Sequence, residues 1–401
     1  MKNNKLFTAS ILLALVCGGI LGLFSFPFIH HSAQIMGELF LNMLKLISLP
    51  LIFLATISTL TKMTSLKEAK IFLKKTLKYT LITTLIAATV GCFLFVTIRP
   101  TQSIENLPSF QTPVTSPYLS FLIKIIPPNL IQPFLENNAL GAMFIATLSG
   151  IAIISLPSKQ AALLRDFFEA LFDMLLKITS ILIVVIPIGV LSFTILFVKT
   201  IQEGNIQIQQ FLLYGACVIG ANLLQGFCIL PLILKLRGAS PKFVIRGAIP
   251  ALTMAFFSKS SSATLPLTIN CAKNRLKISD KTANFTLPLC SVINMNGCAA
   301  FILITIFFVC TSHGMTFTPW IMIFWIVIST CVAIGNAGVP MGCFFLTTAL
   351  LVGMGVPIAI MGMILPLYFL FDMIETTLNV WSDICITTLV DREISRQPPL
   401  T

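Results

Sequence analysis

The sequence predicts an all-α polytopic membrane protein. Of its 401 residues, 56% are hydrophobic and only 10% are charged, whereas a soluble globular domain carries about 25% charged residues. Its apolar runs reach the roughly 20 residues that a helix needs to cross a bilayer. Only helices and closed barrels satisfy their backbone hydrogen bonds in lipid, and these runs are too long and too uniformly apolar for barrel strands.

Ten apolar runs follow one another along the chain, and each contains a candidate span. They cover residues 6–29, 36–60, 79–98, 119–155, 171–198, 208–234, 249–271, 283–311, 319–360 and 362–390. The first run follows Lys2 and Lys5 as in a signal peptide, but no clear small-residue cleavage site follows it, so we expect a retained helix. The polar, proline-rich segment 99–118 is expected to be an extracellular loop.

The basic residues, which give a net charge of +12, fall mainly in alternate gaps between the runs. This is the positive-inside pattern. It predicts that both termini are cytoplasmic, in a protein of the inner (cytoplasmic) membrane, and it argues against nucleic acid as a partner. The eleven cysteines form no C-x-x-C pair and lie mostly in apolar stretches, so we expect buried thiols.

Two apolar segments are interrupted by polar residues or helix breakers at their centres. Residues 248–272 contain a serine cluster, and residues 329–360 contain Gly, Asn and Pro. Non-helical backbone at membrane depth is tolerated only where protein or a watery cavity satisfies it. Paired interrupted segments point to the substrate site of a transporter, so each segment is predicted to enter the membrane, turn and return. An ordinary kinked span is the alternative.

The last apolar run carries three carboxylates. At 100° per residue, Asp372, Glu375 and Asp383 lie on one stripe of a helix together with Asn379. A carboxylate at the bilayer centre costs roughly 2.5–3.5 kcal/mol even on insertion scales. The stripe therefore predicts a cavity that holds Na⁺, protons or the ammonium group of a ligand. Pairing with Lys259 is the structural alternative for any one of the carboxylates.

Four motifs in the second half of the chain carry a resemblance to a known family. They are "SKSSSATLPLTINCA", "FTLPLCSVINMNG", "GNAGVP" and "DMIETTLNVWSD", in this order. Together with the early segment "LFLNMLKLISLPLIFLATISTL", they resemble the sodium:dicarboxylate (glutamate/neutral amino acid) symporter family over nearly the whole chain. The resemblance implies eight transmembrane helices and two re-entrant helical hairpins, assembled as a homotrimeric elevator-type transporter in the lipid bilayer.

The resemblance also implies a division of the chain. Residues 1–247 would form mainly the scaffold and trimerisation helices 1–6, of which helices 3 and 6 travel with the transport domain. Residues 248–392 would form the transport core, with hairpin one at 248–272, helix 7, hairpin two at about 329–360, and helix 8. Residues 393–401 would be a cytoplasmic tail.

The resemblance implies three groups of site residues. The substrate would contact Lys259, Ser260, Ser261, Ser262, Cys298, Val339, Cys343, Asp372, Glu375, Thr376 and Asn379, with the serine tip at its carboxylate and Asp372 at its amino group. Two sodium sites would use Cys290, Asn294, Asn379 and Asp383, and Val292, Met295, Ala333, Ile334 and Asn336. A third cation site would use Thr83, Thr84 and Asn296.

The departures from the family pattern bear on the substrate. Glu375 stands where members that carry acidic substrates have an Arg, and Cys298 replaces a Thr. Both changes favour a neutral or cationic amino acid over an acidic one. Asn296 replaces an Asp of the third cation site, so that site is expected to be weakened and fewer cations to be coupled.

The sequence therefore predicts a secondary active symporter that couples the inward flow of Na⁺ to the uptake of an amino acid, and no enzyme activity. H⁺ coupling, a glutamate, aspartate or C4-dicarboxylate substrate, and a passive anion channel stay open as alternatives. An intramembrane hydrolase built on Ser261 and Lys259 is the remote one, because residues so close in sequence rarely form a catalytic dyad.

Overall fold

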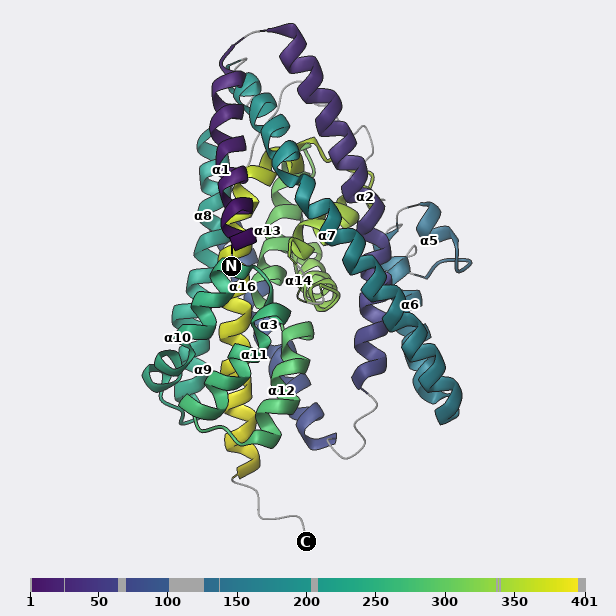
Figure 1. The fold of residues 1–401 in the computed structure, drawn as a ribbon, viewed down its shortest axis with the longest axis vertical. Helices are drawn as coiled ribbons and strands as arrows, with labels where there is room; N and C mark the ends of the chain where they lie inside the picture. Colours follow the sequence, from purple (N-terminus) through teal and green to yellow (C-terminus); the bar gives the residue numbers. More distant parts are fainter. Residues whose placement is uncertain are drawn as a thin grey trace.

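The computed structural model describes residues 2–24, 26–63, 70–100, 126–136, 138–202, 208–336, 338 and 340–395. Every regular element in these ranges is a helix (Figure 1), which confirms the all-α prediction. The first part of the chain forms α1 (Lys2–Gly22), α2 (Pro27–Met63), α3 (Lys70–Ile98), α5 (Gln132–Leu135), α6 (Ala139–Ser155), α7 (Ser158–Gln202), α8 (Ile208–Leu224), the π-helical turn η2 (Gln225–Ile229) and α9 (Leu230–Leu236). The second part forms α10 (Pro241–Ser258), α11 (Ser261–Asn270), the π-helical turn η3 (Cys271–Arg275), α12 (Asp280–Ile293), α13 (Asn296–Ser312), α14 (Pro319–Ile334), α15 (Gly342–Gly353) and α16 (Ala359–Ser395).

Several helical stretches in the described ranges have the length and composition of membrane spans. Five are long and apolar enough: Phe72–Ile98, Val184–Gln202, Ile208–Leu236, Asp280–Ser312 and Ala359–Ile394. Shorter apolar helices accompany them, at Ala9–Gly22, Leu49–Ser58, Gly141–Ser155, Pro319–Ile334 and Gly342–Gly353. Many large hydrophobic side chains on the outside of the helices are exposed, as a protein surface that faces lipid requires.

Each interrupted segment folds as two helices joined by a short turn. α10 and α11 meet at Lys259 and Ser260, and α14 and α15 are joined around Asn336 and Gly338. The hairpins begin earlier than predicted, because α10 starts at residue 241 and α14 at residue 319. Both helices have a proline in their first turn, where its missing N–H removes no intrahelical hydrogen bond.

The predicted run 119–155 is not one helix. Residues 119–125 lie outside the described ranges, as do residues 101–118 of the expected loop, and the remainder of the run is divided between α5 and α6. Asn138 starts α6, because its side-chain oxygen accepts a hydrogen bond of 3.0 Å from the Gly141 N–H. The polar residues before α6 therefore end one helix and cap the next.

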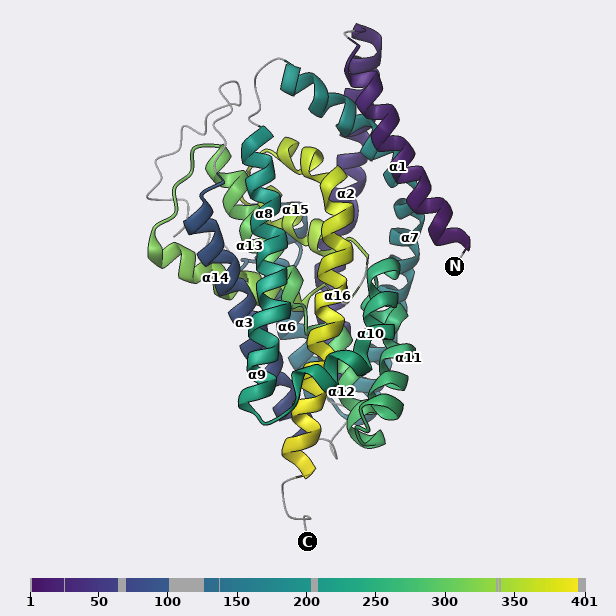
Figure 2. The same cartoon turned by 90° about the vertical axis from the view of Figure 1, so that its left-hand side faces the viewer.

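The broken helix α12–α13 lies at the centre of the fold. α13 packs against α3, α8, α14, α15 and α16, and all its residues except Thr311 are buried. An apolar surface on every side is what such a central position requires. Figure 2 shows α1 and α7 on one side of α16, with α3 and α14 on the other.

α16 approaches α7 closely at one glycine. Gly362 lies against the ring of Phe193, and the ring atoms occupy the space that a Cβ at position 362 would need. Phe193 also packs edge-on against Phe40 of α2, with ring centroids 6.3 Å apart. One aromatic side chain therefore contacts both α2 and α16.

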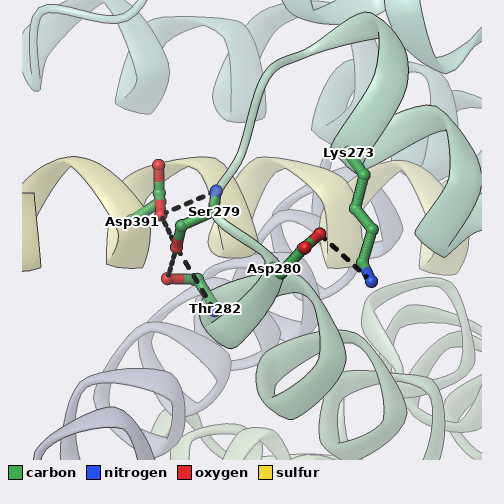
Figure 3. Close-up of polar contacts among 5 residues, drawn as sticks. All are labelled: Lys273, Ser279, Asp280, Thr282 and Asp391. Atoms are coloured by element: carbon green, nitrogen blue, oxygen red, sulfur yellow. Dashed lines mark hydrogen bonds and ion pairs between the residues drawn. The ribbon is translucent and has the colours of Figure 1, made fainter.

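Polar contacts join the start of α12 to the C-terminal end of α16 (Figure 3). Ser279 caps α12 by accepting a hydrogen bond from the Thr282 N–H at 3.3 Å, and its hydroxyl donates to Asp391 Oδ1 at 2.7 Å. Beside them, Lys273 Nζ lies 3.2 Å from Asp280 Oδ1. These contacts bring the gap after hairpin one next to the last turns of α16.

At the same end of the molecule, Glu393 forms ion pairs with basic residues of two other segments. Lys75 and Arg237 each lie 3.5 Å from its carboxylate. The start of α3, the connection between α9 and α10, and the end of α16 therefore meet at the lower end of the view in Figure 1.

Candidate functional site

A small cavity lies between the two hairpin turns, α13 and α16. Its lining residues come from α11, α13, α15, α16 and the two breaks in the helices: Ser261, Met295, Cys298, Asn336, Gly338, Cys343, Asp372, Glu375, Thr376 and Asn379. Most residues of the predicted substrate group are in this set. Lys259, Ser260 and Ser262 do not line the cavity, and Val339 lies outside the described residues.

The two hairpin turns touch each other at the cavity. Ser260 caps α11 by accepting a hydrogen bond of 3.2 Å from the Ala263 N–H, and its hydroxyl donates to the Gly338 carbonyl at 3.3 Å. Ser260 is used as the cap of α11, and of the three serines only Ser261 lines the cavity, with 3% of its surface exposed. The N-terminus of α11 therefore meets the cavity, and free N–H groups there suit an anion.

Gly338 is required at the turn of hairpin two. Its φ of +67° lies in the left-handed region, and a Cβ on it would lie 2.5 Å from the Ser291 carbonyl oxygen. An L-residue would therefore be strained and would also collide with the end of α12.

One face of α16 supplies four polar side chains to the cavity wall. Asp372, Glu375, Thr376 and Asn379 are between 1% and 6% exposed. Both Glu375 oxygens and Asp372 Oδ2 have no hydrogen-bond partner among the described residues. Because a buried polar group without a partner is costly, these atoms mark the places where a ligand would contribute hydrogen bonds or charge.

Lys259 lies on the other side of Asp372. Its backbone is left-handed, with φ +53°, where it ends α10. Its Nζ lies 3.8 Å from the centroid of the Phe369 ring, and Lys259 and Asp372 both line a neighbouring cavity beside α1 and α7. The lysine therefore faces the second cavity and stacks on an aromatic ring.

The expectation that the cysteines are all free thiols is wrong for two of them. Cys298 in α13 and Cys343 in α15 are joined by a disulfide that spans 45 residues of sequence. The sequence could not indicate this pair, because only the folded hairpin two brings α15 beside α13. Nine other cysteines are free, and six of these are buried.

The first predicted sodium site is built around a buried carboxylate. Asp383 is 2% exposed and accepts a hydrogen bond of 2.8 Å from Asn294 Nδ2. The backbone N–H of Asn294 donates to the Cys290 carbonyl at 2.8 Å. None of the ion pairs found among the described residues includes Asp383. A buried carboxylate among neutral oxygens fits a monovalent cation. Asn379 is turned away, because its Oδ1 accepts from the Gly297 N–H at 2.9 Å.

The second predicted sodium site falls at two helix breaks that lie together. Val292 and Met295 flank the break between α12 and α13, and Ala333, Ile334 and Asn336 surround the end of α14. Asn336 Nδ2 lies 3.7 Å from Met295 Sδ, which places the two breaks in contact. Carbonyls at helix ends lack some intrahelical partners and suit a cation. The Met295 and Ala333 carbonyls, however, accept hydrogen bonds of 3.1 Å from the N–H groups of Ala299 and Asn336.

The third predicted cation site is filled by an amide. Asn296 Nδ2 donates to Asn294 Oδ1 at 2.7 Å, to Ser382 Oγ at 3.0 Å and to Thr83 Oγ1 at 3.3 Å. Thr84, the residue after Thr83, is also buried, and its hydroxyl has no hydrogen-bond partner among the described residues. The oxygens of Thr83, Asn294 and Ser382 converge on this NH₂ group, and the weakening of the cation site stays a prediction.

The sequence reasoning missed Gln225 and Ser382 as members of this network. Gln225 lies in η2, is 1% exposed, and donates from Nε2 to Asn296 Oδ1 at 2.8 Å and to the Thr83 carbonyl at 3.0 Å. A buried glutamine in an otherwise apolar run was the available signal, because polar side chains inside a span usually have a specific partner.

Similarity to known proteins extends over nearly the whole chain. The family model described as "Sodium:dicarboxylate symporter family" matches residues 7–393. The chain is 26% identical over 455 aligned positions to excitatory amino acid transporter 3 of Oryctolagus cuniculus, covering 98% of this chain and 86% of that protein. It is 26% identical over 446 positions to the L-cystine uptake protein TcyP of Shouchella clausii, covering 99% and 92%. It is 25% identical over 400 positions to neutral amino acid transporter B(0) of Oryctolagus cuniculus, covering 90% and 73%.

Proposed function

Because the chain belongs to the sodium:dicarboxylate symporter family, we propose that it is a sodium-coupled symporter for a neutral or cationic amino acid. One observation carries the choice of substrate. Glu375 is 1% exposed in the cavity wall, and neither of its oxygens has a hydrogen-bond partner among the described residues. A carboxylate on the substrate side chain would be repelled by Glu375, whereas a neutral hydrogen-bond donor or a cation would be attracted.

The cavity offers a distinct place to each part of an amino acid. The α-carboxylate would bind at the N-terminus of α11 beside Ser261, and the α-ammonium group would bind Asp372, whose Oδ2 has no hydrogen-bond partner among the described residues. Thr376 lies one turn further along α16 in the same wall. The substrate side chain would then extend towards Glu375 and Cys298.

Asp383 is the centre of the proposed coupling. A bound Na⁺ would neutralise this buried carboxylate, and Asn294 holds the carboxylate in place through the 2.8 Å hydrogen bond. Asn379 lines the substrate cavity and lies one helical turn from Asp383. Through this short segment of α16, ion binding and substrate binding would act on the same group of side chains.

The rest of the proposal concerns assembly and orientation. We propose a homotrimer in the cytoplasmic membrane, with residues 248–392 as the moving core and both termini in the cytoplasm. The orientation is supported by the basic segments around Lys75, Arg237 and Lys273, which lie together at the end where α16 finishes. Members of the family are transporters, so the chain is grouped with transporters and not with intramembrane hydrolases.

Uptake of radiolabelled amino acids into proteoliposomes, driven by an imposed Na⁺ gradient, tests the proposal. We expect uptake of neutral or basic amino acids that stops when K⁺ replaces Na⁺ on both sides. An equal proton gradient without Na⁺ distinguishes H⁺ coupling. Uptake of aspartate, glutamate or a C4-dicarboxylate in preference to the others would refute the assigned substrate class and leave the symporter assignment standing.

Asp383→Asn tests the ion site separately. This change removes the charge and keeps the shape of the side chain, so it should abolish the gain in thermal stability that Na⁺ gives over K⁺. A saturating ligand at a hundredfold excess over Kd stabilises by about 2.7 kcal/mol. A variant that still gains as much stability from Na⁺ as the parent would exclude Asp383 from the site.

A further inference from the structure

Three groups that commonly bind metals meet in the cavity from three different helices. Cys298 of α13, Cys343 of α15 and Glu375 of α16 have sulfur and oxygen atoms within 4.8 Å of one another. All three side chains are buried, at 1%, 2% and 1% exposure. This arrangement lies in the wall of the cavity, and Asp383 is not among the residues that line it.

The described side chains around Cys298, Cys343 and Glu375 provide no positive charge to balance the buried carboxylate. Both Glu375 oxygens have no hydrogen-bond partner among the described residues, and none of the residues that line the cavity is Lys, Arg or His. Two amides point at the sulfurs: Asn336 Nδ2 lies 3.0 Å from Cys298 Sγ and 3.5 Å from Cys343 Sγ, and Asn379 Nδ2 lies 3.5 Å from Cys298 Sγ. Amide donors on sulfur favour its thiolate form, which a bound metal requires.

We propose that the reduced protein binds one thiophilic divalent cation, of the Zn²⁺ or Cd²⁺ type, through Cys298 Sγ, Cys343 Sγ and the Glu375 carboxylate. Two thiolates and one carboxylate can all be charged in this buried space only when a divalent cation lies between them. Sulfur ligands select such metals over Na⁺, which prefers oxygen. Three protein ligands leave the fourth position of a tetrahedral site open.

The disulfide between Cys298 and Cys343 makes the site depend on redox state. Opening it takes up two electrons and two protons, which two molecules of a monothiol supply as they become one disulfide. Only the resulting pair of thiols can bind the metal, with loss of their protons to solvent. The oxidised protein keeps α13 and α15 covalently joined and has no thiolate ligands at this position.

A metal in this position would exclude the substrate. Asp372, Thr376 and Ser261 line the same cavity, so the metal and an amino acid would occupy overlapping space. The metal site goes beyond the proposed transport function, and its binding is measurable on purified protein whatever the substrate is.

Cd²⁺ titration of the purified full-length protein tests the inference, read out by the ultraviolet charge-transfer absorption of Cd²⁺–thiolate bonds. The parent for this experiment carries Cys17→Ser, Cys228→Ser and Cys331→Ser, which removes the free cysteines that are exposed or half-buried. After reduction, we expect one tight Cd²⁺ per chain with the absorption of two thiolates. Without reduction, we expect no such band.

Four further variants decide whether the named residues form the site. Cys298→Ser and Cys343→Ser, which change only one atom, should each abolish the tight step. Glu375→Gln should keep the band but weaken binding by at least about tenfold, since even outer-shell partners of a metal contribute 10–100-fold. Equal titrations of the reduced parent and the Cys298→Ser/Cys343→Ser double variant would overturn the proposal, and so would equal binding before and after reduction. Absence of transport in proteoliposomes would leave this result unaffected.

Discussion

Gln225 Nε2 donates a 2.8 Å hydrogen bond to Asn296 Oδ1, and this contact fixes the orientation of the Asn296 amide. With its oxygen held by Gln225, the amide presents its NH₂ to the oxygens of Thr83, Asn294 and Ser382. These oxygens are the kind of ligand that Na⁺ prefers. The protein therefore supplies these oxygens with a hydrogen-bond donor of its own.

Asn296→Asp should create a cation site at this network. The new carboxylate has no N–H to donate, so the oxygens of Thr83, Asn294 and Ser382 lose their donor while Gln225 keeps an acceptor. We expect a steeper dependence of uptake on Na⁺ concentration, with the Hill coefficient higher by about one because one more ion is bound per cycle. Asn296→Ala, which adds no charge, is the matched control and should not become steeper. An unchanged Hill coefficient in Asn296→Asp contradicts the prediction.

Glu375→Arg should shift the substrate preference towards aspartate and glutamate. The guanidinium group would replace an unpaired buried carboxylate in the cavity wall and attract the second carboxylate of such a substrate. Competition against a fixed radiolabelled substrate measures the change. Glu375→Gln removes the charge without reversing it and should give an intermediate profile. If all three proteins prefer the same amino acids, Glu375 does not contact the substrate.

Gly338→Ala should destabilise the protein more than Gly314→Ala. Both glycines have positive φ, +67° and +81°, but only at Gly338 would a Cβ collide, at 2.5 Å from the Ser291 carbonyl oxygen. The left-handed backbone alone costs on the order of 1–2 kcal/mol per residue, and the collision adds to that. Thermal unfolding of both variants in detergent provides the comparison. Equal losses would mean that the turn of hairpin two moves to accommodate the methyl group.

Ser279→Ala should lower stability by about 0.5–2 kcal/mol, the usual cost of losing an N-cap. The change removes the cap of α12 and the 2.7 Å hydrogen bond to Asp391. Lys273→Ala serves as the control, because its partner Asp280 has an 81% exposed side chain and exposed ion pairs contribute at most about 1 kcal/mol. Denaturant or thermal unfolding measures both. A larger loss in the Lys273 variant would reverse our ranking of the two contacts.

The sequence was sufficient for the fold class, because membrane spans leave a strong hydropathy signal. Hairpin one was placed late, since the start of α10 contains Lys242 and Arg246 and reads as a polar gap. Hairpin two was also placed late, since α14 is uniformly apolar and reads as an ordinary span. In both cases the residue composition marked where the segment changes polarity, whereas the first helix of the hairpin begins several residues earlier.

The candidate site was only partly accessible from the sequence. The stripe of α16 follows from helical periodicity, so Asp372, Glu375 and Asp383 could be grouped in advance. The disulfide between Cys298 and Cys343, and the contact of Gln225 with Asn296, join residues 45 and 71 positions apart. Such pairs depend on how hairpin two and η2 pack against α13, and no local pattern records that packing.

The aromatic ring of Phe193 rests in the notch that Gly362 leaves in α16. If α16 were to shift lengthwise past α7, the gap at Gly362 would move away from the ring, because the neighbouring positions in the sequence, Met361 and Met363, both have side chains. Such a shift would require the Phe193 side chain to change its rotamer, and the ring could return only opposite another small residue of α16. The width of one missing methyl group would then set the barrier to such a movement.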